Sequence, residues 1–497
     1  MVEPGSDGAR PAIRYVVLSD LHFGARNSVL TSVVDSGTEA SGYSAEPRTP
    51  SPVLTGLIDG LRHLTAGQER RPTLIMAGDI LDLALSPDEV AATVFSGFAA
   101  LAFGPDHTGI PLFDPVAYYL PGNHDHHLWE TAREDQYTDY VAGLGVADDL
   151  VAPWHTTAMR PDDASPPISS RLLTSLVRRQ PGCGHVDVRV AYPNLALTAP
   201  DHRRAVVVSH GHFIEPIYTL MTRLKDILYP EQRLADPDDI DSWESENFAW
   251  IDFFWSTLGR SGQVGTDVGL VYAGLASKSV LDDLAANLAK GVMVKGKGPT
   301  WLRPLETQLV AAVLKREVNR ISRSERGNPD VALSAASRSG LVTYLQRPVR
   351  TQMVAELGRV PDEVSFVFGH THKPFVEPVG VDGYPAAVQV LNTGGWVVDT
   401  DVAAPHQAGV VVLVGDDLHA VGLEIYRQSP DGSATPVRVL ASPGNGDGGG
   451  QSPSEAPGGA LGTALADIDP TTEPWRSLSV AAADAVAERH RLQAALM

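Results

Sequence analysis

The stretch IRYVVLSDLHFG, residues 13–24, joins a run of apolar and β-branched residues to two polar residues that can bind a metal ion. The run 13–18 has the length and composition of a strand buried in an α/β sheet. Asp20 and His22 follow it directly. Because ligands of α/β sheets bind beyond the carboxyl ends of the strands, this stretch predicts a buried strand that ends in a ligand site.

The same arrangement occurs four more times along the chain. The apolar runs are residues 73–76, 116–120, 205–208 and 365–368. The polar residues that follow these runs are Asp79, Asn123 with His124, His210 with His212, and His370 with His372. Strand ends that carry Asp, Asn and His at five places predict one shared site in an α/β fold.

The residue types in these five motifs suit a pair of divalent metal ions. Hydrolysis of a phosphate ester by two metals needs oxygen and imidazole ligands, a bridging carboxylate and an open position for water. The motifs are DLH at 20–22, GD at 78–79, GNHD at 122–125, HGH at 210–212 and GHTH at 369–372. This ligand chemistry fits Mn, Fe or Zn.

The order of the five motifs closely resembles the calcineurin-like metallophosphoesterase superfamily, over about residues 13–425. The resemblance implies an α/β fold in which two mixed β-sheets, flanked by helices, form a four-layer sandwich. It also implies two bound divalent ions, with Mn the expected metal and Fe or Zn as alternatives. The implied reaction is hydrolysis of a phosphomonoester, phosphodiester or pyrophosphate by a hydroxide that bridges the two metals.

The resemblance assigns a role to each motif. One metal would be surrounded by Asp20, His22, Asp79 and His372, and the other by Asp79, Asn123, His210 and His370. His124 would lie near the substrate and stabilise charge or protonate the leaving group, with Asp125 orienting it. His212 is a candidate substrate-binding residue, although a packing role competes. Asp82 could support a ligand or provide a charge at a helix N-terminus.

Within the superfamily, three segments are similar to the branch around UDP-2,3-diacylglucosamine hydrolase. They are SDLHFG at 19–24, GHTHKP at 369–374 and NTGGW at 392–396. Two features depart from that branch. His210 and His370 are 160 positions apart, which is much longer than the usual lid of that branch, and His124 stands where that hydrolase has another residue. The expected substrate is therefore a phosphate-containing small molecule or a lipid-like molecule, and the two departures leave open which of the two it is.

The motifs and the composition divide the chain into regions. Residues 1–212 and 361–430 should form the metallophosphoesterase core, and residues 213–360 a mostly helical insertion that acts as a lid or substrate module. Residues 440–472 are rich in Gly, Ser and Pro, which predicts a disordered linker. Residues 28–52 should form a loop before a helix at about 53–64, and residues 473–497 could form a short helix. Within the insertion, residues 290–350 carry 12 Lys and Arg against four acidic residues, which could attract an anionic substrate.

Composition narrows the class of protein. The chain has 497 residues and a formal net charge of −21, which argues against a general nucleic-acid coat. It contains one cysteine, Cys183, and no signal peptide or membrane-spanning run, so we expect a cytoplasmic protein, with peripheral membrane contact as an option. The alternatives are a nuclease or cyclic-nucleotide phosphodiesterase of the same superfamily, and a metal-free binding scaffold.

Overall fold

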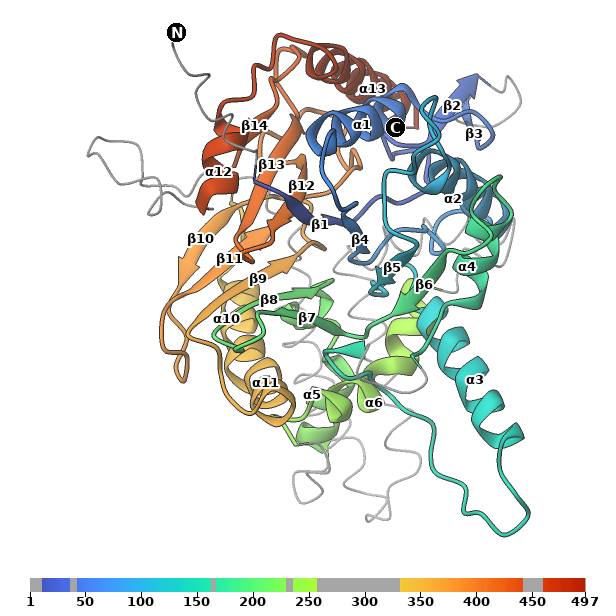
Figure 1. Cartoon of the computed structure of the whole chain (residues 1–497), viewed down its shortest axis with the longest axis vertical. Coiled ribbons are helices and arrows are strands. Elements are labelled where there is room, and N and C mark those ends of the chain that lie inside the picture. Colours follow the sequence, from blue (N-terminus) through green and yellow to red (C-terminus); the bar gives the residue numbers. More distant parts are fainter. Residues whose placement is uncertain are drawn as a thin grey trace, which may run out of the picture.

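The computed structural model describes residues 11–35, 43–161, 167–228, 236–256, 331–440 and 459–496. In these residues the chain forms two larger mixed β-sheets, a small two-stranded sheet and the helices around them (Figure 1). The predicted α/β class is therefore confirmed.

The larger sheet has seven strands, and the predicted strand at 13–18 lies in its middle as β1. The strand β1 pairs in parallel with β4 and antiparallel with β12, so the sheet is mixed. In spatial order the strands are β14 (Arg438–Val439), β13 (Ala420–Arg427), β12 (Ala408–Gly415), β1 (Ile13–Leu18), β4 (Thr73–Met76), β5 (Val116–Tyr119) and β6 (Asp187–Val190).

The second sheet has five strands and is also mixed. Its central pairs, β11 with β9 and β9 with β8, are parallel, whereas both outer pairs are antiparallel. In spatial order the strands are β10 (Val376–Val379), β11 (Val388–Asn392), β9 (Glu363–Phe368), β8 (Arg204–Ser209) and β7 (Asn194–Thr198). The two-stranded sheet consists of β2 (Ser32–Asp35) and β3 (Tyr43–Glu46).

The alternation of side chains along β1 shows how this strand is buried between the two sheets and the helices. Val16 and Leu18 belong to one apolar cluster, which also contains residues of the helices over the seven-stranded sheet. Val17 points the other way, into a cluster that also holds Val206 and other residues of the five-stranded sheet. Successive side chains of a strand face opposite sides, so β1 is buried on both faces. This explains its unbroken apolar sequence.

Helices cover the outer faces of the sheets (Figure 1). The helices packed in the cluster of the seven-stranded sheet are α1 (Pro52–Thr65), α2 (Asp88–Phe103), α3 (His127–Ala142), α4 (Arg171–Arg178), α12 (Gly459–Ala466) and α13 (Trp475–Leu496). Those packed in the cluster of the five-stranded sheet are η2 (His212–Ile214), α6 (Ile240–Ile251), α10 (Ala335–Tyr344), η6 (Leu345–Val349) and α11 (Arg350–Leu357). Two more segments, α5 (Leu220–Leu228) and η3 (Asp252–Ser256), lie next to α6.

Helix α1 shows how local sequence sets the ends of such an element. The Ser51 side chain accepts a hydrogen bond from the Leu54 amide, and Pro52 occupies the first helical turn. Arg62 and His63 lie in the last turn, where a positive charge interacts favourably with the helix dipole. The predicted helix at 53–64 is thus confirmed.

The C-terminal part of the chain differs from its prediction. The stretch 440–472 was expected to be disordered, yet residues 459–466 form α12, because Leu461 and Leu465 bury one face of it. Residues 441–458 lie outside the described residues. The helix predicted within 473–497 is present as α13, which has 22 residues and packs on α1.

The predicted insertion is only partly described. Its described portions, 213–228, 236–256 and 331–360, are mostly helical. Residues 257–330 lie outside the described part, and with them most of the basic stretch expected at 290–350.

Candidate metal centre

The two sheets bring all five motifs together. Strands β1, β4 and β5 are parallel neighbours in one sheet, and β8 and β9 are parallel neighbours in the other. Each strand is followed within a few residues by one motif. The carboxyl ends of parallel neighbours share one edge of a sheet, so each sheet contributes its motifs at one edge. All of the predicted metal ligands are buried.

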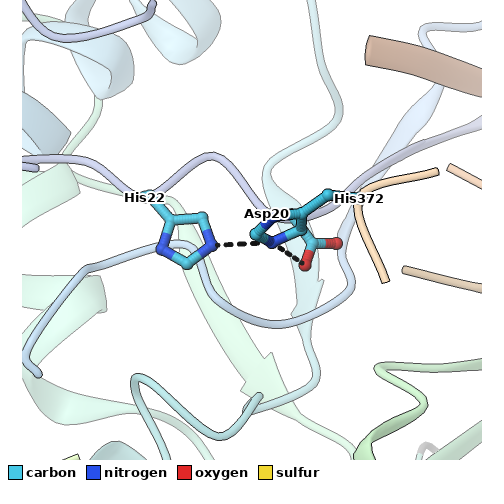
Figure 2. A group of neighbouring side chains, drawn as sticks. All are labelled: Asp20, His22 and His372. Carbon is cyan, nitrogen blue, oxygen red and sulfur yellow. Dashed lines mark hydrogen bonds and ion pairs between the residues drawn. The ribbon is translucent and has the colours of Figure 1, made fainter. Parts of the chain in front are cut away.

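Asp20, His22 and His372 form the first group that could hold a metal ion (Figure 2). The Nε2 atom of His372 lies 3.4 Å from Asp20 Oδ1 and 3.3 Å from His22 Nε2. Asp20 and His22 come from the loop after β1, whereas His372 comes from the loop after β9. Residues 350 positions apart in sequence therefore offer ligand atoms to one point.

Asp79, His210 and His370 form the second such group. His210 Nε2 lies 3.5 Å from Asp79 Oδ2 and 3.0 Å from the side-chain oxygen of Asn123. Asn123, the fourth predicted ligand here, therefore lies in reach. Its Nδ2 atom has no hydrogen-bond partner among the described residues, and neither does His370 Nδ1.

A third overlapping group, His22, Asp79 and His124, connects the first two. His22 Nε2 lies 3.8 Å from Asp79 Oδ2, and the backbone amide of His124 donates to Asp79 Oδ1 over 2.7 Å. Asp79 thus lies between the first and second groups, where a bridging carboxylate would have to be.

The histidine ring orientations fit metal ligation. His22 Nδ1 lies 3.0 Å from Asp82, and His372 Nδ1 lies 2.8 Å from Asp399. His210 Nδ1 lies 3.1 Å from the carbonyl oxygen of Ala77. A ring whose Nδ1 is held by an acceptor carries its proton there and keeps Nε2 as a lone-pair donor. Nε2 is therefore the atom that each of these three rings can offer to a metal ion, and all three Nε2 atoms point into the site, so these residues fit a metal ion.

The backbone of the ligands is strained. Seven non-glycine residues in the described part of the chain have positive φ, and five of them are predicted ligands: Asp20, His22, Asp79, His370 and His372. Their φ angles range from 47° to 68°. Such conformations are costly for residues with a Cβ and tend to collect at functional sites. The loops after β1, β4 and β9 are thus shaped to aim side chains.

Two glycines allow the close approach of the ligands. A Cβ on Gly369 would lie 1.9 Å from Asp20 Oδ2, and one on Gly78, whose φ is +88°, would lie 2.4 Å from His210 Nδ1. Both contacts are far shorter than atoms tolerate, so only glycine fits at these positions.

The carboxylates remain charged despite their burial. Burial would raise the pKa of Asp79, but the charges of His210, His124 and His22 together lower it below its usual range. Burial likewise opposes ionisation of Asp20, and the hydrogen bond from His372 with the charge of His210 lowers its pKa. An ionised, buried pair of carboxylates surrounded by imidazoles is suited to a divalent cation.

The orienting role predicted for Asp125 is wrong. Its two carboxylate oxygens accept from four backbone amides, those of Asp79, Ile80, Leu81 and Gly122. His124 Nδ1 instead lies 3.2 Å from Asp82 Oδ1. Of the two roles left open for Asp82, the ligand-supporting one fits, because its carboxylate holds both His22 and His124.

His212 lies next to the centre and outside its three groups. Its ring is buried and stacks on Tyr192, whose hydroxyl is 3.3 Å from Nε2. Burial, with the charges of His210 and His370, holds the pKa of His212 well below its usual value. A neutral, stacked imidazole fits the packing alternative.

A fourth group of possible ligands, His126, Glu130 and Glu244, is better explained as ion pairs. His126 Nε2 lies 2.8 Å from Glu244, and Arg133 donates to Glu130 over 2.6 Å. Burial opposes charge on His126, but Glu244 outweighs it and raises the pKa to about 10. A proton and a guanidinium therefore already neutralise both carboxylates.

Three supporting residues were not predicted from the sequence. Asp399 holds His372, Glu215 lies 3.3 Å from His370 Nε2, and Ser19 donates to Asp20. Ser19 adjoins a motif, so its position carried a signal. Asp399 and Glu215 lie outside the five motifs, so only the fold reveals them.

Comparison with models of known protein families and with curated protein sequences gave no match for the chain. None of the described helices is long and apolar enough to cross a membrane.

Proposed function

We propose that the protein is a dinuclear metal-dependent phosphoesterase of the calcineurin-like type, acting on a phosphomonoester, phosphodiester or pyrophosphate. The observation that carries the proposal is the convergence of the Nε2 atoms of His22, His210 and His372 on Asp20 and Asp79, while each Nδ1 is held from behind. Two mixed sheets that share an apolar cluster support the expected four-layer sandwich.

Two groups with one carboxylate between them support two ions. Asp20, His22 and His372 would hold one, and Asn123, His210 and His370 the other, with Asp79 between them. When bound, the ions would activate a water and neutralise charge on the phosphate. We propose Mn as the metal, with Fe or Zn as alternatives.

His124 is the proposed acid. Asp82 holds its Nδ1, which leaves Nε2 as the atom that can donate to a leaving oxygen. Burial would raise the pKa of Asp82, but the charge of His124 and its hydrogen bond hold that pKa well below the usual range.

The test is hydrolysis of nitrophenyl phosphate and bis(nitrophenyl) phosphate by protein loaded with Mn²⁺. We expect Asp79→Asn to lower kcat on the order of 10³-fold, or about 4 kcal/mol, because the shared ligand is lost. The matched control is Asp139→Asn, since the Asp139 side chain is 58% exposed and pairs with Arg171 on the surface.

Two outcomes would contradict the proposal. If Asp79→Asn keeps its turnover, the metal centre does not take part in the reaction. Fewer than two tightly bound ions per wild-type chain would favour a binding scaffold instead. Comparing the two substrates separates a monoesterase from a diesterase, and adding lipid-linked phosphates to the panel tests the lipid-like substrate.

A further inference from the structure

The C-terminal helix α13 buries an arginine against the loops of the metal centre. Helix α13 lies along α1 (Figure 1), with Trp475 and Leu478 packed where Gly60 and Gly56 leave room. Further along the same helix, Arg489 is only 2% exposed. Burying a guanidinium is expensive unless it is hydrogen-bonded, and an apolar side chain there would cost less. The arginine therefore calls for an explanation beyond packing.

Arg489 pairs with Glu488 through Nη1, and its other partners are backbone carbonyls of the loop after β1. Its Nη2 donates to Ser28 O over 3.0 Å and also to Thr31 O. One turn later, the Gln493 side chain donates to Val398 O over 3.0 Å. Helix α13 is thus bonded to two separate loops.

These two loops are also bonded to each other. The Val29 amide donates to Trp396 O over 2.8 Å, and the Val398 amide donates to Asn27 O over 3.0 Å. Ser28 and Val397 form an antiparallel bridge. The loops therefore behave as one cross-linked unit, with α13 across its back.

This unit supports one ligand group. The Trp396 amide donates to the Asp20 carbonyl over 3.0 Å, and the Ser28 hydroxyl donates to the Leu21 carbonyl over 2.7 Å. Asp399, just past Val398, holds His372 Nδ1 at 2.8 Å. All three ligands of the first group, Asp20, His22 and His372, thus depend on the unit. In the described part of the chain, no hydrogen bond joins α13 to the loops of Asn123 or His210.

We propose that α13 is a strap that positions the Asp20, His22 and His372 group, with Arg489 and Gln493 as its positioning residues. The inference rests on the proposed metal centre, but it concerns one of its two groups only. Losing the Arg489 bonds frees the Ser28 and Thr31 carbonyls and loosens the loop that carries Asp20 and His22. The other metal group keeps its geometry.

The test replaces Arg489 by Met, which keeps the apolar stem and removes the donors. The control is Arg491→Met, the same substitution two residues later at an exposed position. Mn²⁺ is titrated calorimetrically into two metal-free backgrounds. His210→Ala leaves the strapped group as the main site, and His372→Ala leaves the other group.

We expect Arg489→Met to weaken Mn²⁺ binding about tenfold in the His210→Ala background, which corresponds to about 1.4 kcal/mol. In the His372→Ala background the affinity should change less than about twofold. Arg489→Lys should restore part of the loss, because one donor returns. Equal weakening in both backgrounds, or none in either, would overturn the strap.

A second measurement needs neither metal nor turnover. The two variants are compared as single substitutions in metal-free protein. Hydrogen exchange at the Val29 and Val398 amides should become faster in Arg489→Met and stay unchanged in Arg491→Met. Unchanged exchange would overturn the strap even if the protein proves inactive. If Arg489→Met does not fold, Gln493→Ala, which removes the one bond to Val398, takes its place with the same expected directions. If hydrogen exchange changes as expected but the Mn²⁺-loaded wild-type protein hydrolyses neither substrate, the strap stands and only the proposed function is refuted.

Discussion

Replacing Asp125 by Asn should destabilise the fold far more than a single side-chain contact would suggest. Oδ1 accepts from the amides of Gly122 at 2.7 Å and Asp79 at 3.2 Å, and Oδ2 accepts from Ile80 at 2.8 Å and Leu81 at 3.3 Å. An Asn side chain has one oxygen, so its NH₂ group must face two backbone donors. Two hydrogen bonds to the carboxylate, each worth about 1.5–3 kcal/mol, are lost, and two buried amides are left without an acceptor.

We therefore expect the free energy of unfolding to fall by about 3 kcal/mol, since these two costs overlap in part. Urea denaturation of the metal-free protein, followed by tryptophan fluorescence, measures it. Asp139→Asn, which disrupts only a surface pair with Arg171, should cost less than about 1 kcal/mol. A loss below about 1 kcal/mol for Asp125→Asn would refute the view that this carboxylate holds the loop of Asp79.

Two further predictions concern a close approach and a buried ion pair. Gly369→Ala should abolish Mn²⁺ binding in a calorimetric titration, since its Cβ would lie 1.9 Å from Asp20 Oδ2, whereas Gly380→Ala, with no atom within 4 Å, should leave binding unchanged. Burial lowers the pKa of His126, but Glu244 and Asp252 together raise it to about 10, so the pairing of His126 with these carboxylates stabilises the fold fully below about pH 6.5. Wild-type stability should fall as the pH rises from 6.5 to 10, and Glu244→Gln should flatten that fall in urea denaturation; equal slopes would contradict the ion pair.

The parts of the fold that sequence predicted well are those with local causes. Residues 13–18 and 73–76 match β1 and β4 residue for residue, because an apolar run that stops at small polar residues marks a strand buried on both faces. The candidate metal ligands were predicted for the same reason, since each follows its strand within a few residues. The loop expected at 28–52 contains the hairpin of β2 and β3, whose polar sequence carries no such pattern.

What sequence could not predict depends on distant partners. Asp125 was assigned to its neighbour His124, but its oxygens face amides more than 40 residues away in three of four bonds. Asp399 reaches His372 only because β9 and β11 are parallel neighbours. In α13, the pattern of small and apolar residues predicts a helix, but nothing in it shows where Arg489 will be buried.

The strained ligands and the supports around them have one physical origin. A left-handed backbone at Asp20, His22 or His372 costs free energy that the loop alone cannot offset, so surrounding contacts must fix it. The Trp396 amide on the Asp20 carbonyl is one such contact, and the Asp399 carboxylate on His372 is another. Because both come from the loop that α13 bonds, the strain of this ligand group is balanced from the far end of the chain. A short-range motif can therefore name the ligands, whereas their geometry depends on residues hundreds of positions away.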